Sequence, residues 1–309
     1  MEQLDLDDWR AFVAVADTGT FTAGASSLGW SVPTVSKRVA ALERRLGVSL
    51  FHRTSRRLAL SPTGETVLPS AREHVRGLAA VEDSLRERDC APGGRIRMSA
   101  PVSFSIAHLG GPLTSFLRDW PDIDLDLRIS DETIDLVGGG FDLALRIGRL
   151  PDSSLKARKL CDIRMPLVAA PAYLAAAGRP QHPDDLKRHQ AIVYAQVRDP
   201  TRWTFRHDLE GERTVEVSPR LTVDNGDLGL EALRAGLGLT VQPEFFIYDD
   251  LASGTLEEVM LPWSMPPVGA YIVTPPSALR PRRVSLLIEH LASSLARLPW
   301  AYGAHPSST

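Results

Sequence analysis

Residues 6–47 constrain the fold more than any other part of the chain, because two helical apolar repeats are separated there by short turns. The first repeat consists of four apolar side chains at helical spacing: Leu6, Trp9, Val13 and Ala16. Gly19 ends that helix, and a second short helix is expected over residues 22–28. Residues 29–31 then form a tight turn. This order predicts a helix-turn-helix unit.

The next helix is expected to begin after Ser31, a good N-cap, with Pro33 in its first turn. Its apolar residues fall at i, i+4, i+7 and i+11 on one face: Val35, Val39, Leu42 and Leu46. Gly47 ends the helix, and residues 50–60 follow as two short strands around Thr54 and Ser55. Helices followed by a basic hairpin have the layout of a winged helix-turn-helix.

Charge is distributed unevenly along the chain. Residues 31–60 hold seven basic side chains and one acid, a net charge of +6, whereas residues 91–309 hold 23 basic and 26 acidic side chains. The whole chain carries a net charge of -3, which excludes a uniformly basic coat for nucleic acid. The pattern favours a small anion-binding head on a neutral to acidic body, with a merely solvated charged face as the alternative.

Residues 9–65 resemble the DNA-binding head of LysR-type transcriptional regulators, through FVAVADTGTFTAGASSLG, SVPTVSKRVAALERRLG and LFHRT. The resemblance implies a double-stranded DNA operator as partner. Phosphates would be held by Lys37, Arg38, Arg53, Arg56 and Arg57, and base edges would face Val32, Pro33, Thr34, Ser36 and Lys37. The family often has Gln where Val32 stands here, and Val32 can offer only apolar contact.

A long helix is expected from Ser61 to about Arg88, and its apolar residues follow a coiled-coil spacing: Leu68, Ala71, Val75, Leu78 and Leu85. The resemblance implies that this linker helix, within residues 61–90, joins the chain into a homodimer or homotetramer. The alternative is an ordinary helix packed on its own domain.

Beyond Gly94, strands alternate with helices, which predicts an α/β fold with a parallel sheet. GRIRMSAPVSF and RAGLGLTVQPEFF are among the segments that extend the resemblance to the family's effector domain, a two-lobed fold like that of periplasmic binding proteins. The expected division is a winged helix-turn-helix at 1–60, a linker helix at 61–90, an effector domain at 91–299 and a tail at 300–309. Lobe I would comprise 94–163 and 268–298, and lobe II 164–267.

In this fold, ligands sit between the lobes, at the carboxyl ends of strands and at helix N-termini. The residues expected there are Ser103, Phe104, Ser105, Ser130, Glu132, Arg146 and Asn225. Ser103 resembles the family position that often holds an effector carboxylate, so a small anion is the expected effector. Alternatively, Ser103 only caps a helix and Arg146 only pairs with a neighbouring acid.

The remaining patterns argue against catalysis, metals, cofactors and membranes. Two cysteines and scattered histidines supply no metal motif, and no apolar run reaches the roughly 20 residues of a membrane span. No phosphate loop, dinucleotide loop or nucleophile motif is complete. The acidic start MEQLDLDDW is unlike a secretory signal, so a cytoplasmic location is expected. The alternative functions are a solute-binding protein or an enzyme on the same two-lobed fold.

Overall fold

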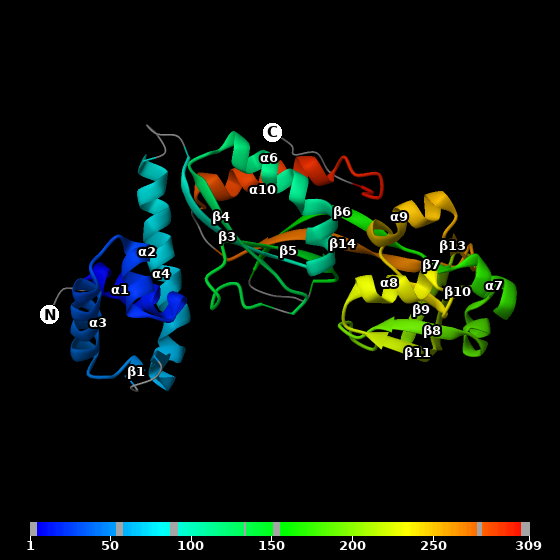
Figure 1. The fold of residues 1–309 in the computed structure, drawn as a ribbon, viewed down its shortest axis with the longest axis horizontal. Helices are drawn as coiled ribbons and strands as arrows, with labels where there is room; N and C mark the ends of the chain where they lie inside the picture. Colours follow the sequence, from blue (N-terminus) through cyan, green and yellow to red (C-terminus); the bar gives the residue numbers. More distant parts are fainter. Residues whose placement is uncertain are drawn as a thin grey trace.

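The computed structural model describes residues 5–53, 58–86, 92–132, 134–150, 155–276 and 280–303. Figure 1 shows a helical head followed by two lobes, each built around its own sheet. This is the fold class that the sequence predicts.

The head contains three helices and a two-stranded antiparallel sheet: α1 (Leu6–Thr18), α2 (Phe21–Leu28), α3 (Val32–Leu46), β1 (Phe51–Arg53) and β2 (Leu58–Leu60). Each helix ends at a glycine with positive φ, which only glycine adopts without strain. The apolar face of α3 packs into the head's core, where Val35, Val39 and Leu42 are fully buried. Leu46, the fourth residue of the predicted face, is 40% exposed.

Helix α4 (Pro62–Arg86) follows the hairpin and packs against α1 of the head (Figure 1). Ser61 caps it, because its Oγ accepts a hydrogen bond of 3.0 Å from the N–H of Gly64. At Gly64 a Cβ would collide with the carbonyl oxygen of Leu50, so glycine permits this close approach of helix and strand.

The first lobe is a five-stranded sheet in the order β4-β3-β5-β14-β6, with α6 and α10 over one face. Its elements are β3 (Gly94–Ala100), α5 (Val102–Phe104), a π-helical turn (Ser105–Leu109), α6 (Gly110–Asp119), β4 (Ile123–Ile129), β5 (Leu143–Gly148), β6 (Lys156–Met165), β14 (Met265–Thr274) and α10 (Arg282–Leu295).

The second lobe is a five-stranded sheet in the order β11-β8-β12-β7-β13, with a separate hairpin formed by β9 and β10. Its elements are β7 (Leu167–Ala169), α7 (Pro171–Ala177), a 3-10 helix (Pro183–Arg188), β8 (Gln190–Tyr194), β9 (Arg202–His207), β10 (Gly211–Glu216), β11 (Ser218–Val223), α8 (Gly226–Arg234), β12 (Leu239–Val241), α9 (Glu244–Ser253) and β13 (Glu257–Glu258).

The expectation of parallel sheets is only partly right. Strand β3 is parallel to β4 and β5, and β8 is parallel to β11 and β12. In contrast, β14 is antiparallel to β5 and β6, and β7 is antiparallel to β12 and β13. The reason is that the chain leaves the first lobe through β6 and returns through β14, so these two strands run in opposite directions.

The C-terminal segment corrects a second expectation. Residues 300–309 are expected to form a tail, but the side chain of Trp300 is only 2% exposed and belongs to the core of the first lobe. Its ring lies 5.7 Å from Phe104 and 4.9 Å from His108, measured between ring centroids. The backbone of Tyr302 then forms an antiparallel bridge with Asp162 of β6. The structure therefore extends the lobe past residue 299.

Candidate nucleic-acid interface and effector site

The start of α3 presents a compact polar surface. Val32, Pro33, Thr34 and Lys37 are exposed, and Ser36 is half-buried. Ser31 caps the helix by accepting a 3.3 Å hydrogen bond from the N–H of Thr34, and the two hydroxyls lie 2.8 Å apart. The geometry leaves the first turn and a half of α3 open to a partner.

Arg38 does not belong to this open surface. Its guanidinium forms ion pairs with Asp5, with Asp7 at 3.4 Å and with Asp8 at 3.3 Å, all from the start of α1. Burial by itself lowers the pKa of Arg38, but hydrogen bonds to Asp5 and Asp8 outweigh it and raise the pKa. The expectation that Arg38 binds phosphate is therefore not supported, because its guanidinium is already paired with these three carboxylates.

Arg45 is used in the same way. Its Nη1 lies 3.1 Å from Oδ2 of Asp8, and Asp8 is only 4% exposed. The acidic run LDLDDW could have revealed both pairings, since α1 must cross the basic helix to close the core. Two of the seven basic charges in residues 31–60 thus hold α1 against α3.

Glu43 connects α3 to the wing, the antiparallel hairpin of β1 and β2. Its Oε1 accepts hydrogen bonds from the N–H groups of Leu50, at 2.8 Å, and Phe51, at 3.2 Å. The strands of the wing pair in register, with His52 opposite Ala59. Arg56, Arg57 and the side chain of Arg53 lie outside the described residues, so their contact with phosphate stays a prediction.

The predicted coiled-coil seam of α4 is divided between two environments. Leu68 and Ala71 are each 6% exposed and pack in the head's own core, with Val75 against it. Leu78 is 46% exposed, and the side chain of Leu85 is outside the described part. The seam is therefore wrong as a continuous stripe, because its first half is needed to close the head.

In the effector domain, Ser103 lies at the contact between the lobes. Ser103 is 7% exposed, and its Oγ donates a 2.6 Å hydrogen bond to Oδ2 of Asp227 in α8. Asn225 holds that turn, because its Oδ1 accepts from the N–H groups of Asp227 and Leu228. The structure thus brings Ser103 and Asn225 together through Asp227, a residue that no sequence motif marks.

The side chains of Phe104 and Ser105, next to Ser103, make contacts within the first lobe. Phe104 is 1% exposed, with its ring 5.1 Å from that of Phe245, so it packs in the core and offers no surface to a ligand. The hydroxyl of Ser105 donates to the carbonyl of Pro101 at 2.6 Å. The expectation that these two residues contact an effector is not supported, because both side chains are already used by the lobe itself.

Residues 130–132 form a turn beside α5. The N–H of Glu132 donates to Oγ of Ser130 at 3.1 Å, and Asp131 accepts a 3.0 Å hydrogen bond from the N–H of Val102. On the other lobe, burial raises the pKa of Tyr194 to about 12, and the charges of Asp131 and Asp224 add to this. Carboxylates from both lobes, those of Asp131 and Asp224, therefore lie near Tyr194.

Arg146, near the end of β5, carries a positive charge that no acid among the described residues balances. Its Nη1 donates to Oγ of Ser99 and to the carbonyl of Leu145, both at 3.2 Å. In the part of the chain that the structure describes, Nη2 is buried and has no hydrogen-bond partner. Burial lowers the pKa of Arg146, since desolvation disfavours the charged form. The alternative of a pairing between Arg146 and a neighbouring acid finds no support in the described residues.

Where the chain crosses between the sheets, a cluster of charged side chains joins them. Arg164 of β6 donates to both carboxylate oxygens of Glu258, at 2.7 and 2.8 Å, and lies 3.4 Å from Glu244. The hydroxyl of Tyr302 donates to the same Glu244 at 3.3 Å. These residues fix the crossover, and no local sequence motif marks them, because they are far apart in the chain.

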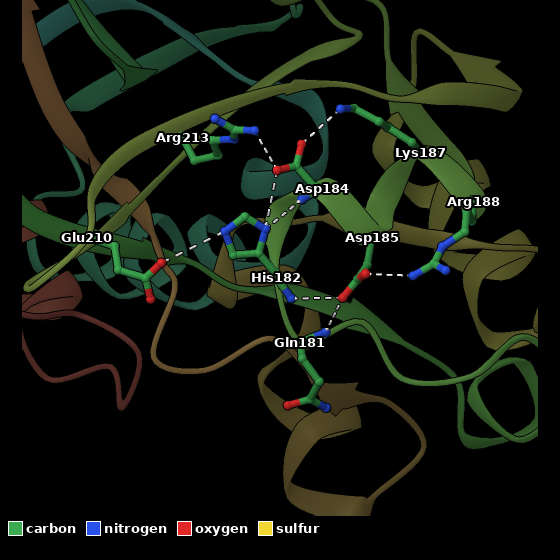
Figure 2. Close-up of polar contacts among 8 residues, drawn as sticks. All are labelled: Gln181, His182, Asp184, Asp185, Lys187, Arg188, Glu210 and Arg213. Carbon is green, nitrogen blue, oxygen red and sulfur yellow. Dashed lines mark hydrogen bonds and ion pairs between the residues drawn. The ribbon is translucent and has the colours of Figure 1, made fainter.

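Figure 2 shows a second polar cluster, on the outer part of the second lobe. It consists of Gln181, His182, Asp184, Asp185, Lys187, Arg188, Glu210 and Arg213. His182 Nδ1 accepts from the N–H of Asp184 at 3.2 Å, and Asp185 accepts from the N–H groups of Gln181 and His182. Arg213 reaches from β10 to Asp184 at 2.5 Å. These contacts cap the 3-10 helix and tie it to the hairpin, which is a structural role.

Two family models match the chain. The LysR substrate binding domain matches residues 91–296, and the bacterial regulatory helix-turn-helix protein of the lysR family matches residues 6–65. The chain belongs to the LysR family of transcriptional regulators.

Similar proteins support this over nearly the full length of the regulator. It is 35% identical to the HTH-type transcriptional regulator PtxR of Pseudomonas aeruginosa, over 97% of this chain and 96% of that protein. Two solved structures are 27% identical: the virulence activator AphB of Vibrio cholerae (TM-score 0.60, 94% of this chain and 99% of AphB) and CrgA of Neisseria meningitidis (TM-score 0.61, 96% and 100%). Full-length OxyR from Pseudomonas aeruginosa, at 17% identity and a TM-score of 0.75 over 100% of both chains, shares the fold.

The family decides between the functions that the sequence left open. The chain is a DNA-binding transcriptional regulator with a domain for a small-molecule effector, rather than a solute-binding protein or an enzyme on the same fold. Among the described residues of this regulator, no helix is both long and apolar enough to cross a bilayer. The same residues contain no group of three or more metal-binding side chains placed to hold an ion.

Proposed function

We propose that this regulator, acting in the cytoplasm, binds a double-stranded DNA operator with the start of α3 in the major groove. Val32, Pro33, Thr34 and Ser36 would face base edges, and Lys37 would bind a phosphate together with Arg53, Arg56 and Arg57 of the wing. The supporting observation is that Thr34 and Lys37 share an exposed face of α3, with Val32 exposed at its first position, while the opposite face of the helix is buried. Arg38 is left out, because Asp5, Asp7 and Asp8 hold it.

Operator selection tests this placement. A footprint on the DNA beside the regulator's own coding region first locates a binding site. The wild type and Thr34→Ala then each select preferred sites from a randomised DNA library. Thr34→Ala should change the preferred bases without abolishing binding, because one base contact contributes about 1–3 kcal/mol of discrimination. Thr66→Ala, which alters an exposed threonine on α4, is the matched control. Identical preferences for Thr34→Ala and the wild type would contradict the placement.

The assembly is proposed to be a homodimer or homotetramer joined through α4. The supporting observation is that α4 continues past the head as an exposed helix with Leu78 and Val81 on its surface, 46% and 38% exposed. Apolar side chains at this spacing need a partner helix to be removed from water. A dimer also places two heads on two half-sites of DNA.

The effector is proposed to be a small anion, most simply a carboxylate, held at Arg146 and Ser103. The observation that carries this is the buried guanidinium nitrogen of Arg146, which has no partner among the described residues. A buried unpaired donor on a charged group is costly, and an anion would satisfy it. A carboxylate accepts two parallel hydrogen bonds from a guanidinium, which suits this chemistry.

Calorimetry of the full chain tests the effector class. The probes are acetate, succinate and benzoate, each compared with its neutral amide. Binding of carboxylates but not amides is the expected result, and Arg146→Met should reduce carboxylate binding tenfold or more, since one hydrogen bond to a charged group contributes about 1.5–3 kcal/mol. Arg149→Met, which alters an exposed arginine three residues further along, is the control. Binding of amides alone would contradict the proposal.

A further inference from the structure

The hydroxyl of Ser103 is already engaged by the chain itself. It donates to Asp227 over 2.6 Å, and the two residues are 124 positions apart in the sequence. Ser103 belongs to α5 of the first lobe and Asp227 to α8 of the second, so the bond joins the lobes. A serine hydroxyl has one proton and donates one hydrogen bond at a time. Ser103 therefore cannot donate to an effector anion while Asp227 is in place.

The backbone of Asp227 is fixed, but its carboxylate has no ion-pair partner among the described residues. Asn225 fixes its backbone, because Oδ1 of Asn225 accepts the N–H groups of Asp227 at 3.0 Å and Leu228 at 3.3 Å. No cation of the described residues lies within ion-pair distance of this carboxylate, and Asp227 is exposed. A helix N-terminus favours an acid in its first turn. That preference alone does not direct the carboxylate toward a serine on the other lobe.

We propose that Asp227 competes with the effector for Ser103, and that the Ser103–Asp227 bond is a latch between the lobes which an anion opens. This inference rests on the proposed anionic effector. An entering anion takes the hydroxyl of Ser103 and the free nitrogen of Arg146, and the displaced carboxylate of Asp227 turns toward solvent. Repulsion between the anion and Asp227 then favours a different arrangement of the two lobes.

The latch sets a threshold for the effector. If it is closed in about nine of ten molecules, the apparent Kd is about tenfold above that of an open site, because binding is limited to the open fraction. An anion that cannot also use Arg146 gains too little to displace Asp227. Asp227 is thus a residue that determines specificity, although it contributes no attraction to the effector.

Amide hydrogen exchange of the full chain tests the latch without any ligand. Ser103→Ala and Asp227→Ala should each speed exchange in residues 101–109 several-fold, and the double variant should be no faster than the faster single one. Exchange at residues 101–109 decides the test, because these residues lie in the first lobe. Removing Asp227 from the first turn of α8 would by itself affect exchange only in α8. Asp224→Ala, at a neighbouring exposed acid, is the control. Unchanged exchange at 101–109 in Asp227→Ala would overturn the latch.

Calorimetry then tests the competition, with acetate, succinate and benzoate as probes. Asp227→Ala should bind the carboxylate that the wild type binds about tenfold more tightly. Asp227→Asn keeps an acceptor for Ser103 without the charge, so its affinity should lie in between. Equal affinities of the wild type and Asp227→Ala would overturn the competition. If no variant binds any of these carboxylates, the anionic effector and the competition both fail, and the exchange experiment still decides the latch.

Discussion

Arg38 of α3 and Asp8 of α1 are joined by an ion pair of 3.3 Å inside the head, although Arg38 lies next to the exposed Lys37. The two neighbouring cations therefore have different roles. Asp8 is only 4% exposed and also binds Arg45, so this small network holds α1 against α3. Of these two cations, Lys37 is exposed and Arg38 is half-buried.

We predict that Lys37→Ala flattens the salt dependence of operator binding, whereas Arg38→Ala does not. Each lost phosphate contact lowers the slope of log K against log salt by about 0.9, or about 1.8 for a protein with two heads. Arg38→Ala should instead lower the free energy of unfolding of the head by about 1 kcal/mol or less, the usual range for partly exposed ion pairs.

Titrations at several salt concentrations, with urea unfolding of the same variants, measure both effects. Equal slopes for Lys37→Ala and the wild type would remove Lys37 from the phosphate contacts. A slope reduced by Arg38→Ala alone would show that the ion pairs open on DNA.

The second prediction concerns the two halves of α4. Leu78→Asp should break the assembly and leave each head folded, because Leu78 is exposed in the single chain. Leu68→Asp should unfold the head, since an unpaired charge would enter its core. Sedimentation measures the first effect and circular dichroism the second. Should Leu78→Asp sediment like the wild type, α4 is not the assembly helix.

The head was the most predictable part of the molecule, because its helices are local and each is marked by a cap and a glycine stop. Ser31 and Gly47 are recognised by residue type as cap and stop, and the buried face Val35–Val39–Leu42 follows from helical spacing. The long-range partners did not follow. The sequence shows that Ser103 precedes a helix, but only the fold brings Asp227 to it from a position 124 residues away.

The seam of α4 illustrates the same limit. Leu68 and Leu78 have the same residue type and lie on one helical repeat, yet one is buried in the head and the other is exposed. Spacing identifies an apolar face, but it does not say which neighbour covers it. The burial of Trp300 cannot be predicted for a related reason, because a short C-terminal segment carries no periodic pattern.

The third prediction concerns this C-terminal segment. Trp300→Ala should lower the free energy of unfolding by about 3–5 kcal/mol, because a large buried side chain is replaced by a cavity. Tyr302→Phe removes the hydrogen bond to Glu244 without leaving a large cavity and should cost about 0.5–1.5 kcal/mol. Urea unfolding at one pH compares the two variants. A loss below 1 kcal/mol for Trp300→Ala would show that the segment is not part of the core.

The last prediction concerns pH. Burial lowers the pKa of His108 below its ordinary value of 6.5, although a hydrogen bond to the Phe245 carbonyl and the charge of Asp249 oppose the shift. Burial likewise lowers the pKa of His189. The unfolded chain therefore takes up protons near pH 6.5, while the folded chain does so only at lower pH. Stability is complete above pH 6.5 and falls as the pH drops from there toward the folded pKa values.

Each histidine can contribute a slope of at most about 1.4 kcal/mol per pH unit. Urea unfolding between pH 7 and 5 should show this loss, and His108→Gln should remove part of it, since glutamine does not titrate. Adding His189→Gln should remove more. The pH range in which the histidines affect stability lies above the range of Asp126, Asp184 and Asp185. The pKa values of these three carboxyls are lowered from 3.8, so their effects on stability appear only in stronger acid. If His108→Gln and the wild type lose stability in parallel down to pH 5, burial of His108 does not couple folding to pH.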